Sequence, residues 1–186
     1  MYILYFIINL FFIVDSKIHS KIFNNNFRSN HYNSLNNVID LMNQEKSYAY
    51  LSTLNFSNKL NGFPHTSLVG LCIDKNGYPI LSMSDISLHT QNIRKNNKCS
   101  ILISINGLKN QNQKRVTFTG NIEKIIDKNE SLEIQKKYLE SHHEAFWLKY
   151  IDFGMYRMSN IKDIYYIGGF GKATKININK YLELFK

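Results

Sequence analysis

Apolar and polar positions alternate along most of the chain after about residue 47. Within residues 48–54, Ala49, Leu51 and Thr53 fall on one face and the intervening side chains on the other, the period of two of a half-buried strand. Similar runs, separated by Gly, Asn and Asp turn residues, predict further strands over residues 65–74, 79–83, 99–105, 115–126, 153–159 and 163–167. So many short strands favour a mainly β chain that closes as a barrel.

Three stretches have helical spacing instead, over residues 35–46, 86–97 and about 127–141. Asp127 followed by Glu130 resembles a capping box. The middle helix follows a strand directly, with Ser84 and Asp85 as candidate N-caps. Its free N–H groups can therefore hold a phosphate or carboxylate. A plain helix cap is the alternative that spacing alone favours.

Eight separated stretches carry a family resemblance: AYLSTL (49–54), GFPHTSLVG (62–70), SDISLHTQNI (84–93), KCSILI (98–103), RVTFTGNIE (115–123), YLESHHEAFW (138–147), DFGMYRM (152–158) and YYIGGFGKA (165–173). In this order they resemble the flavin-binding split barrels of the pyridoxamine 5'-phosphate oxidase superfamily. Within it they are most similar to the branch of haem-utilisation oxygenase-like proteins and plastid proteins that bind glutamyl-tRNA reductase. The resemblance implies a split β-barrel with flanking helices over residues 35–186, which forms a homodimer.

The resemblance also implies a site for FMN. In the flavin oxidases an arginine in the second strand and a lysine at the helix start hold the flavin phosphate, and these positions align with Thr66 and His89. Both are departures from the family pattern, since Thr66 is uncharged and a histidine is mostly neutral at pH 7. The candidate cofactor-binding residues are Thr66, Ser67, Ser84, Ser87, His89, Thr90, Asn92 and Arg115, the last as a supplementary cation.

Three functions follow from the resemblance. The first is an FMN-binding protein, a candidate flavin-dependent oxidoreductase, with the flavin between two barrels. The second is a non-enzymatic plastid regulator that binds glutamyl-tRNA reductase. The third is a haem-binding or haem-degrading protein. The sequence does not identify a catalytic residue.

The chain is basic, with a net charge of +9. After residue 46 there are 19 Lys and Arg against 11 Asp and Glu, so an excess of +8 belongs to the predicted barrel. Such a surface attracts flavin phosphate, haem propionates or an acidic partner. The alternative is that the charge serves solubility alone, because the lysines are scattered among asparagines and form no stripe. A nucleic-acid partner is not expected.

Two further groups of residues have the chemistry of possible sites. His142-His143-Glu144 resembles a metal cluster, but adjacent helical residues point about 100° apart, so no metal site is expected. Cys72 and Cys99 fall in predicted strands and are expected to pack as small apolar residues, with a disulfide as the alternative in an oxidising compartment.

Residues 1–34 have the composition of a leader. Tyr2–Val14 is almost wholly apolar but too short to span a bilayer comfortably, and residues 16–34 are polar, basic and poor in acids. A signal sequence followed by a transit-like segment predicts secretory entry and delivery to a plastid-type, apicoplast-like organelle, with no stable membrane span in the mature form. A secreted, a membrane-tethered and a cytoplasmic protein are the alternatives.

Overall fold

The computed structural model describes residues 33–44 and 47–186. The leader predicted over residues 1–34 falls almost entirely outside them. In the described part, no helix has the length and apolar character needed to cross a membrane.

The chain is mainly β, and its first described element is a helix over residues 33–42. The elements that follow are β1 (Tyr48–Leu54), β2 (Pro64–Ile73), β3 (Pro79–Ser84), α2 (Leu88–Lys95), β4 (Lys98–Ser104), β5 (Arg115–Lys124), α3 (Lys128–Ser141), the 3-10 helix η1 (Phe146–Lys149), β6 (Phe153–Ile167), β7 (Ala173–Lys175) and α4 (Ile178–Glu183). The strands predicted from alternation up to residue 126 are confirmed to within about two residues.

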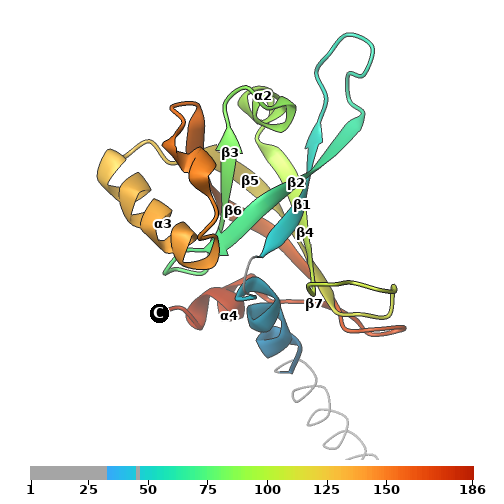
Figure 1. Ribbon diagram of the computed structural model, residues 1–186. Coiled ribbons are helices and arrows are strands. Elements are labelled where there is room, and N and C mark those ends of the chain that lie inside the picture. Colours follow the sequence, from blue (N-terminus) through green and yellow to red (C-terminus); the bar gives the residue numbers. More distant parts are fainter. Residues whose placement is uncertain (1–32, 45–46) are drawn as a thin grey trace, which may run out of the picture.

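Six antiparallel strands close into a barrel in the order β3-β2-β1-β4-β5-β6, because β3 also pairs with β6 (Figure 1). The closing register sets Ile80 opposite Arg157 and Ser84 opposite Phe153. β7 extends the sheet beyond β6. The split-barrel fold class expected from the sequence is thereby confirmed.

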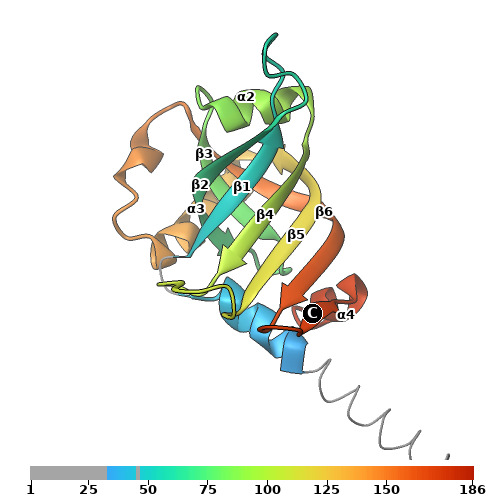
Figure 2. The same cartoon turned by 90° about the vertical axis from the view of Figure 1, so that its right-hand side faces the viewer.

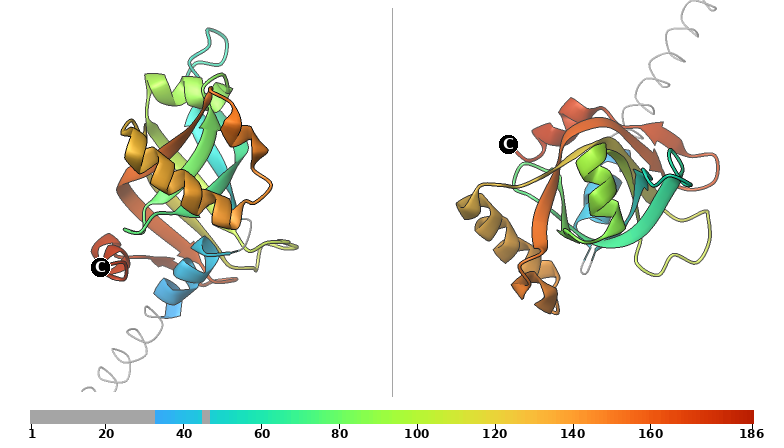
Figure 3. Two further views of the ribbon diagram at one scale, coloured as in Figure 1. Left: turned by 60° about the vertical axis from the view of Figure 1, so that its left-hand side comes forward. Right: turned by 90° about the horizontal axis from the view of Figure 1, so that it is seen from above.

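The barrel is filled by the side chains that alternation directs inward. Leu51 of β1, Ile101 of β4 and Phe118 of β5 are fully buried there. Helix 33–42 adds buried Val38 and Leu41 at one end, where α4 also packs, and α2 lies across the other end (Figure 3). Burying these apolar side chains is the main stabilisation of the barrel.

α3 covers the side of the barrel rather than an end (Figure 1). Its residues Ile134 and Tyr138 pack on Cys72, Ile80 and Met155 in a separate apolar cluster. Asp127 caps the helix as the sequence predicts, and its carboxylate accepts a hydrogen bond of 2.8 Å from the backbone N–H of Glu130.

β6 corrects one prediction, because residues 153–159 and 163–167 belong to a single strand of 15 residues. The β5–β6 register shifts between Thr119 and Gly120, and a Cβ placed at Gly120 would lie 2.5 Å from the carbonyl oxygen of Asn160. A glycine opposite this irregularity lets the strand continue through the polar residues at which the alternation breaks.

Candidate functional site

Four of the eight predicted site residues gather where α2 crosses the end of β1 and β2. Ser67 Oγ lies 3.0 Å from His89 Nδ1, and Asn92 donates a hydrogen bond of 3.1 Å to the hydroxyl of Thr53. Thr90 is fully buried, and its hydroxyl has no hydrogen-bond partner in the described part of the chain. Strand alternation turns Ser67 inward, and helical spacing sets His89 and Asn92 on one side of α2.

His89 is a neutral member of this group. Burial, and secondarily electrostatic interaction with nearby His65, lowers the pKa of His89 below its usual 6.5. Its Nε2 is buried and has no hydrogen-bond partner among the described residues. The group therefore offers hydroxyl, amide and imidazole hydrogen bonds but no fixed positive charge to an anion.

Ser84 and Ser87 lie just before α2 but differ in the hydrogen bonds of their side chains. The Ser84 hydroxyl donates to the carboxylate of Asp152 and accepts from the backbone N–H of Ile86 at 3.3 Å. Ser87 is the N-cap, although its side chain makes no capping hydrogen bond. The helix thus begins at Leu88 rather than Ile86, and the capping roles predicted for Ser84 and Asp85 are wrong because both side chains have other partners.

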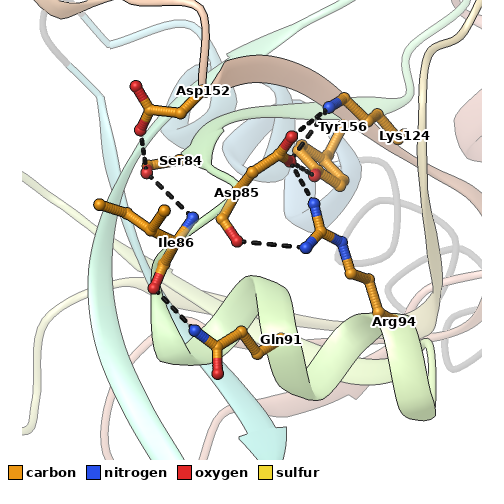
Figure 4. Close-up of polar contacts among 8 residues, drawn as sticks. All are labelled: Ser84, Asp85, Ile86, Gln91, Arg94, Lys124, Asp152 and Tyr156. Atoms are coloured by element: carbon orange, nitrogen blue, oxygen red, sulfur yellow. Dashed lines mark hydrogen bonds and ion pairs between the residues drawn. The ribbon is translucent and has the colours of Figure 1, made fainter.

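Asp85 joins the start of α2 to β5 and β6 (Figure 4). Its carboxylate accepts hydrogen bonds from Lys124 at 2.8 and 3.0 Å and from the Tyr156 hydroxyl at 2.8 Å, and it pairs with Arg94 at 2.9 Å. Burial alone would raise the pKa of Asp85, but these hydrogen bonds and charges outweigh it and lower the pKa below 3.8. Arg94 and Lys124, the two cations that contact Asp85, are therefore already paired.

The remaining predicted residues lie elsewhere. Thr66 is on the outer face of the barrel, where its hydroxyl is 3.1 Å from that of Ser52. Arg115 begins β5 opposite Ser104, and its guanidinium donates to the carbonyl of Gln113 at 3.2 Å. Arg115 is thus at the loop end of β5 and is not brought together with Ser67 and His89.

Strands β2, β1, β4 and β5 lie side by side in the barrel wall (Figure 2). Their register lines up two parallel rows of side chains on the outer face around Thr66. One row is polar: Thr66, Ser52, Ser100 and Thr119 are successive cross-strand partners. The next row is Leu68, Tyr50, Leu102, Thr117 and Tyr165. Three members of the second row are exposed, Leu68 by 59%, Tyr50 by 46% and Tyr165 by 43%. An apolar and aromatic row thus runs beside a hydroxyl row.

A hollow of about 460 Å³ opens on the polar row between β1, β4 and β5. Ser52, Ser100 and Thr119 line it, and two exposed cations, Lys98 and Lys162, stand among its lining residues. We call the two rows and this hollow the outer-face site. The sequence analysis missed Ser100, Lys98 and Lys162, although the alternation within residues 98–104 already places Lys98, Ser100 and Leu102 on one face.

The outer-face site suits a planar ligand with an apolar body and an acidic edge. Aromatic and aliphatic side chains contact the faces of conjugated rings. Hydroxyl groups and lysine ammonium groups bind carboxylates and phosphates. The group formed by Ser67, His89, Thr90 and Asn92, which we call the α2 cluster, instead suits a small polar ligand.

His142 and the two cysteines act as core residues. His142 is fully buried, stacks on Tyr138 with 4.4 Å between ring centroids, and lies 3.0 Å from the carbonyl of Leu71 through Nε2. Its neighbour His143 is exposed. Cys72 and Cys99 are free and buried, as expected for small apolar residues, and burial raises the pKa of each thiol to about 12. Neither thiol is poised as a nucleophile.

Comparison with known proteins adds a family and several relatives. Residues 40–183 match the family described as CREG, beta-barrel. "Non-canonical heme oxygenase HOZ, chloroplastic" of Arabidopsis thaliana is 32% identical over 118 residues, which are 63% of this chain and 36% of that protein. The chain therefore spans about a third of the length of this curated relative.

Solved structures share the fold at lower identity. A heme binding protein from Mycobacterium smegmatis is 21% identical, with a TM-score of 0.63 over 77% of this chain and 57% of that one. A putative pyridoxamine 5'-phosphate oxidase from Listeria innocua is 14% identical, with a TM-score of 0.56 over 73% of this chain and 98% of that one. These likenesses confirm the split barrel as the architecture.

Proposed function

Because the chain belongs to the CREG β-barrel family of split barrels, we propose that it binds haem and that the haem lies on the outer-face site. The observation that carries this proposal is the pairing of an exposed aromatic row with a hydroxyl row and two lysines. Tyr50 and Leu68 would contact the macrocycle, while Ser100, Lys98 and Lys162 would hold the propionates. When bound, haem would supply redox and oxygen chemistry.

Two relatives support haem as the ligand. The Arabidopsis relative is named a heme oxygenase and the mycobacterial one a heme binding protein. We restrict the proposal to binding, because no side chain on the described outer face is assigned a step in haem breakdown.

A second copy of the chain is part of the proposal. Tyr48, Tyr50, Leu54, Leu68 and Tyr165 leave a broad apolar area exposed on one side of the barrel. A homodimer through this side would cover the area and enclose a ligand between two barrels. Leu68→Arg, at the β2 end of the area, would then yield monomers in sedimentation and weaken haem binding, whereas Phe146→Arg on another face would do neither.

FMN binding is the second candidate, and the α2 cluster favours it. Ser67, Thr90 and His89 would donate hydrogen bonds to a flavin phosphate near the start of α2. The same group offers no positive charge, which is why FMN ranks below haem. Binding of a glutamyl-tRNA reductase-like protein stays a prediction that an affinity pull-down of the reductase would test.

A plastid-type location is also proposed, supported by the word chloroplastic in the name of the Arabidopsis relative. A fluorescent protein fused after Lys186 in the source cells would label the organelle. Uniform label throughout the cytoplasm would overturn this part of the proposal.

The ligand class is tested by titrating the full chain with haemin and, separately, with FMN. We expect haemin to give a shifted Soret band that saturates at a fixed ratio to protein, and flavin fluorescence to stay unquenched. Saturable quenching of FMN without a Soret shift would reverse the ranking. The variant His89→Asn separates the two sites, because it is expected to leave haem binding unchanged and to weaken any FMN binding.

A further inference from the structure

Two loops lie together at the end of the barrel where helix 33–42 packs. The first, residues 105–114, joins β4 to β5, and the second, residues 168–172, joins β6 to β7. Their bases are joined through the pairing of Arg115 with Ile167, and a Cβ placed at Gly169 would lie 3.2 Å from the carbonyl oxygen of Asn112. Both loops project from the same corner of the molecule (Figure 1).

Each loop presents one large apolar side chain to solvent. Phe170 is 88% exposed and Leu108 is 43% exposed. Each adjoins a glycine of positive φ, Gly171 at +70° and Gly107 at +74°, and a Cβ placed at either glycine would meet nothing within 4 Å. The tips therefore stand clear of the barrel, and their apolar side chains do not contribute to its core.

The two loop segments and their flanking residues carry only positively charged side chains. Residues 105–115 and 167–175 contain five Lys and Arg and no Asp or Glu. Lys175 is paired with Asp163 at 2.8 Å, whereas Lys109 and Lys172 are exposed on the loops themselves. Exposed apolar tips flanked by lysines are the composition with which peripheral proteins enter the headgroup region of an anionic bilayer.

A second apolar surface lacks this charge asymmetry. Phe146, Tyr150 and Ile151 are also exposed, by 63%, 55% and 103%. The stretch 140–152 that carries them holds three acidic residues and only one lysine, Lys149. An anionic surface would be repelled there, so this surface serves as an internal comparison.

The first residues that the structure describes lie at the same corner as the two loops. Asn33 lines a hollow of about 520 Å³ together with Lys172, and Lys114 Nζ donates a hydrogen bond of 2.6 Å to Asn37. The chain therefore enters the barrel beside the two loops. The sequence before it contains the apolar run Tyr2–Val14 and a basic stretch.

We propose that the loop tips, Leu108 and Phe170, with Lys109 and Lys172, dock this corner on an anionic lipid bilayer. Phe170 and Leu108 enter the interface, and the lysines face the lipid headgroups. Leu108 favours lipid over single-stranded nucleic acid, since an aliphatic side chain offers no face on which a base stacks. The docking is independent of haem binding, because the outer-face hollow lies over β1, β4 and β5 and includes neither loop.

The test moves the chain's single tryptophan to the proposed tip. Trp147→Phe removes the native fluorophore, and Phe170→Trp in that background supplies the reporter in the full chain. With vesicles of phosphatidylcholine and phosphatidylserine we expect the emission to shift to the blue and to be quenched by lipids brominated in their tails. Phe146→Trp in the same background is the matched control and should remain unquenched.

The lysines are tested with the same reporter. Lys109→Gln and Lys172→Gln should each weaken partition into anionic vesicles about fivefold, while Lys136→Gln on α3 should not. A reporter that stays in water while the protein sediments with vesicles would overturn the proposal, because residues before 33 would then bind alone. A blue shift without vesicles that is lost on dilution would also overturn it, because a second copy would then cover the tips.

Discussion

His89 Nδ1 lies 3.0 Å from Ser67 Oγ, so the first turn of α2 is held to the second strand of the barrel by a half-buried imidazole. Ser67 is the cross-strand partner of Leu51 in β1, and the side chain of Leu51 is fully buried in the core. His89, which stands where the family resemblance expects a phosphate-binding lysine, thus holds α2 in place. The charge state of His89 therefore affects the stability of the folded chain.

The first prediction concerns this charge. Burial lowers the pKa of His89 in the folded chain, so between that pKa and 6.5 the unfolded chain binds more protons. The stabilisation is complete above about pH 6.5 and is lost as the pH falls from there toward the folded pKa. In urea titrations, His89→Asn should therefore lose less unfolding free energy than the parent between neutral and mildly acidic pH.

Exposed His143 provides the control, since His143→Asn should keep the slope of the parent chain. If His89→Asn kept that slope as well, the imidazole of His89 would not be held neutral by burial.

The second prediction concerns Asp85, which binds α2 to β5 and β6 through Arg94, Lys124 and Tyr156. Asp85→Asn removes the charge and should cost about 1 kcal/mol of unfolding free energy, less than is usual for charged hydrogen bonds because the cluster is partly exposed. Amide hydrogen exchange in α2 should accelerate. The matched control is Glu123→Gln, since the carboxylate of Glu123 makes only a 3.4 Å contact with Asn97. This variant should leave the hydrogen exchange of α2 unchanged.

The pKa of Asp85 gives this prediction a pH dependence. Because the folded pKa is lowered, the contribution is present above the unfolded value of 3.8 and is lost as the pH falls through the folded pKa. The difference between parent and Asp85→Asn should thus vanish in strong acid. A difference that stayed constant there would mean that the packing of the new amide, rather than the lost charge, accounts for the effect.

The third prediction concerns the fit of α3 against β2. A Cβ at Gly70 would overlap the hydroxyl of Tyr138, a fully buried side chain that stacks on His142. Gly70→Ala should destabilise the chain by about 1 to 3 kcal/mol, the cost of overpacking a core. Adding Tyr138→Phe should recover part of the loss, because it removes the overlapping oxygen, and the double-mutant cycle measures that coupling. Additive losses would show that Tyr138 does not occupy the space beside Gly70.

Local patterns predicted much of this fold. The inward face of β1, with Ala49, Leu51 and Thr53 buried, is confirmed, as is the cap of Asp127 on α3. β6 was divided in two because alternation breaks near Asn160, where a glycine on the neighbouring strand accommodates the irregularity. That adjustment lies on another strand, so no local window of residues contains it.

The candidate site was harder to predict for the same reason. Ser67, His89, Thr90 and Asn92 do lie together, since they come from two elements that the strand-helix junction already relates. Arg115 is apart from them because β5 begins at the end of the barrel opposite to α2. The outer-face site depends on register across β1, β4 and β5, which aligns Ser52 with Ser100 and Thr119. Strand order and register are set by the whole barrel.

The haem proposal is tested most directly by the dissociation constant of haemin, measured from the Soret band. The constant is compared between the double variant Lys98→Glu/Lys162→Glu and the control variant Lys136→Glu on α3. All three sites carry exposed lysines, so the two proteins should keep the parent's circular dichroism. Two unfavourable charges at the propionates should raise the dissociation constant about tenfold, and the α3 control should match the parent. Unchanged affinity in the double variant would contradict haem binding at the outer-face site.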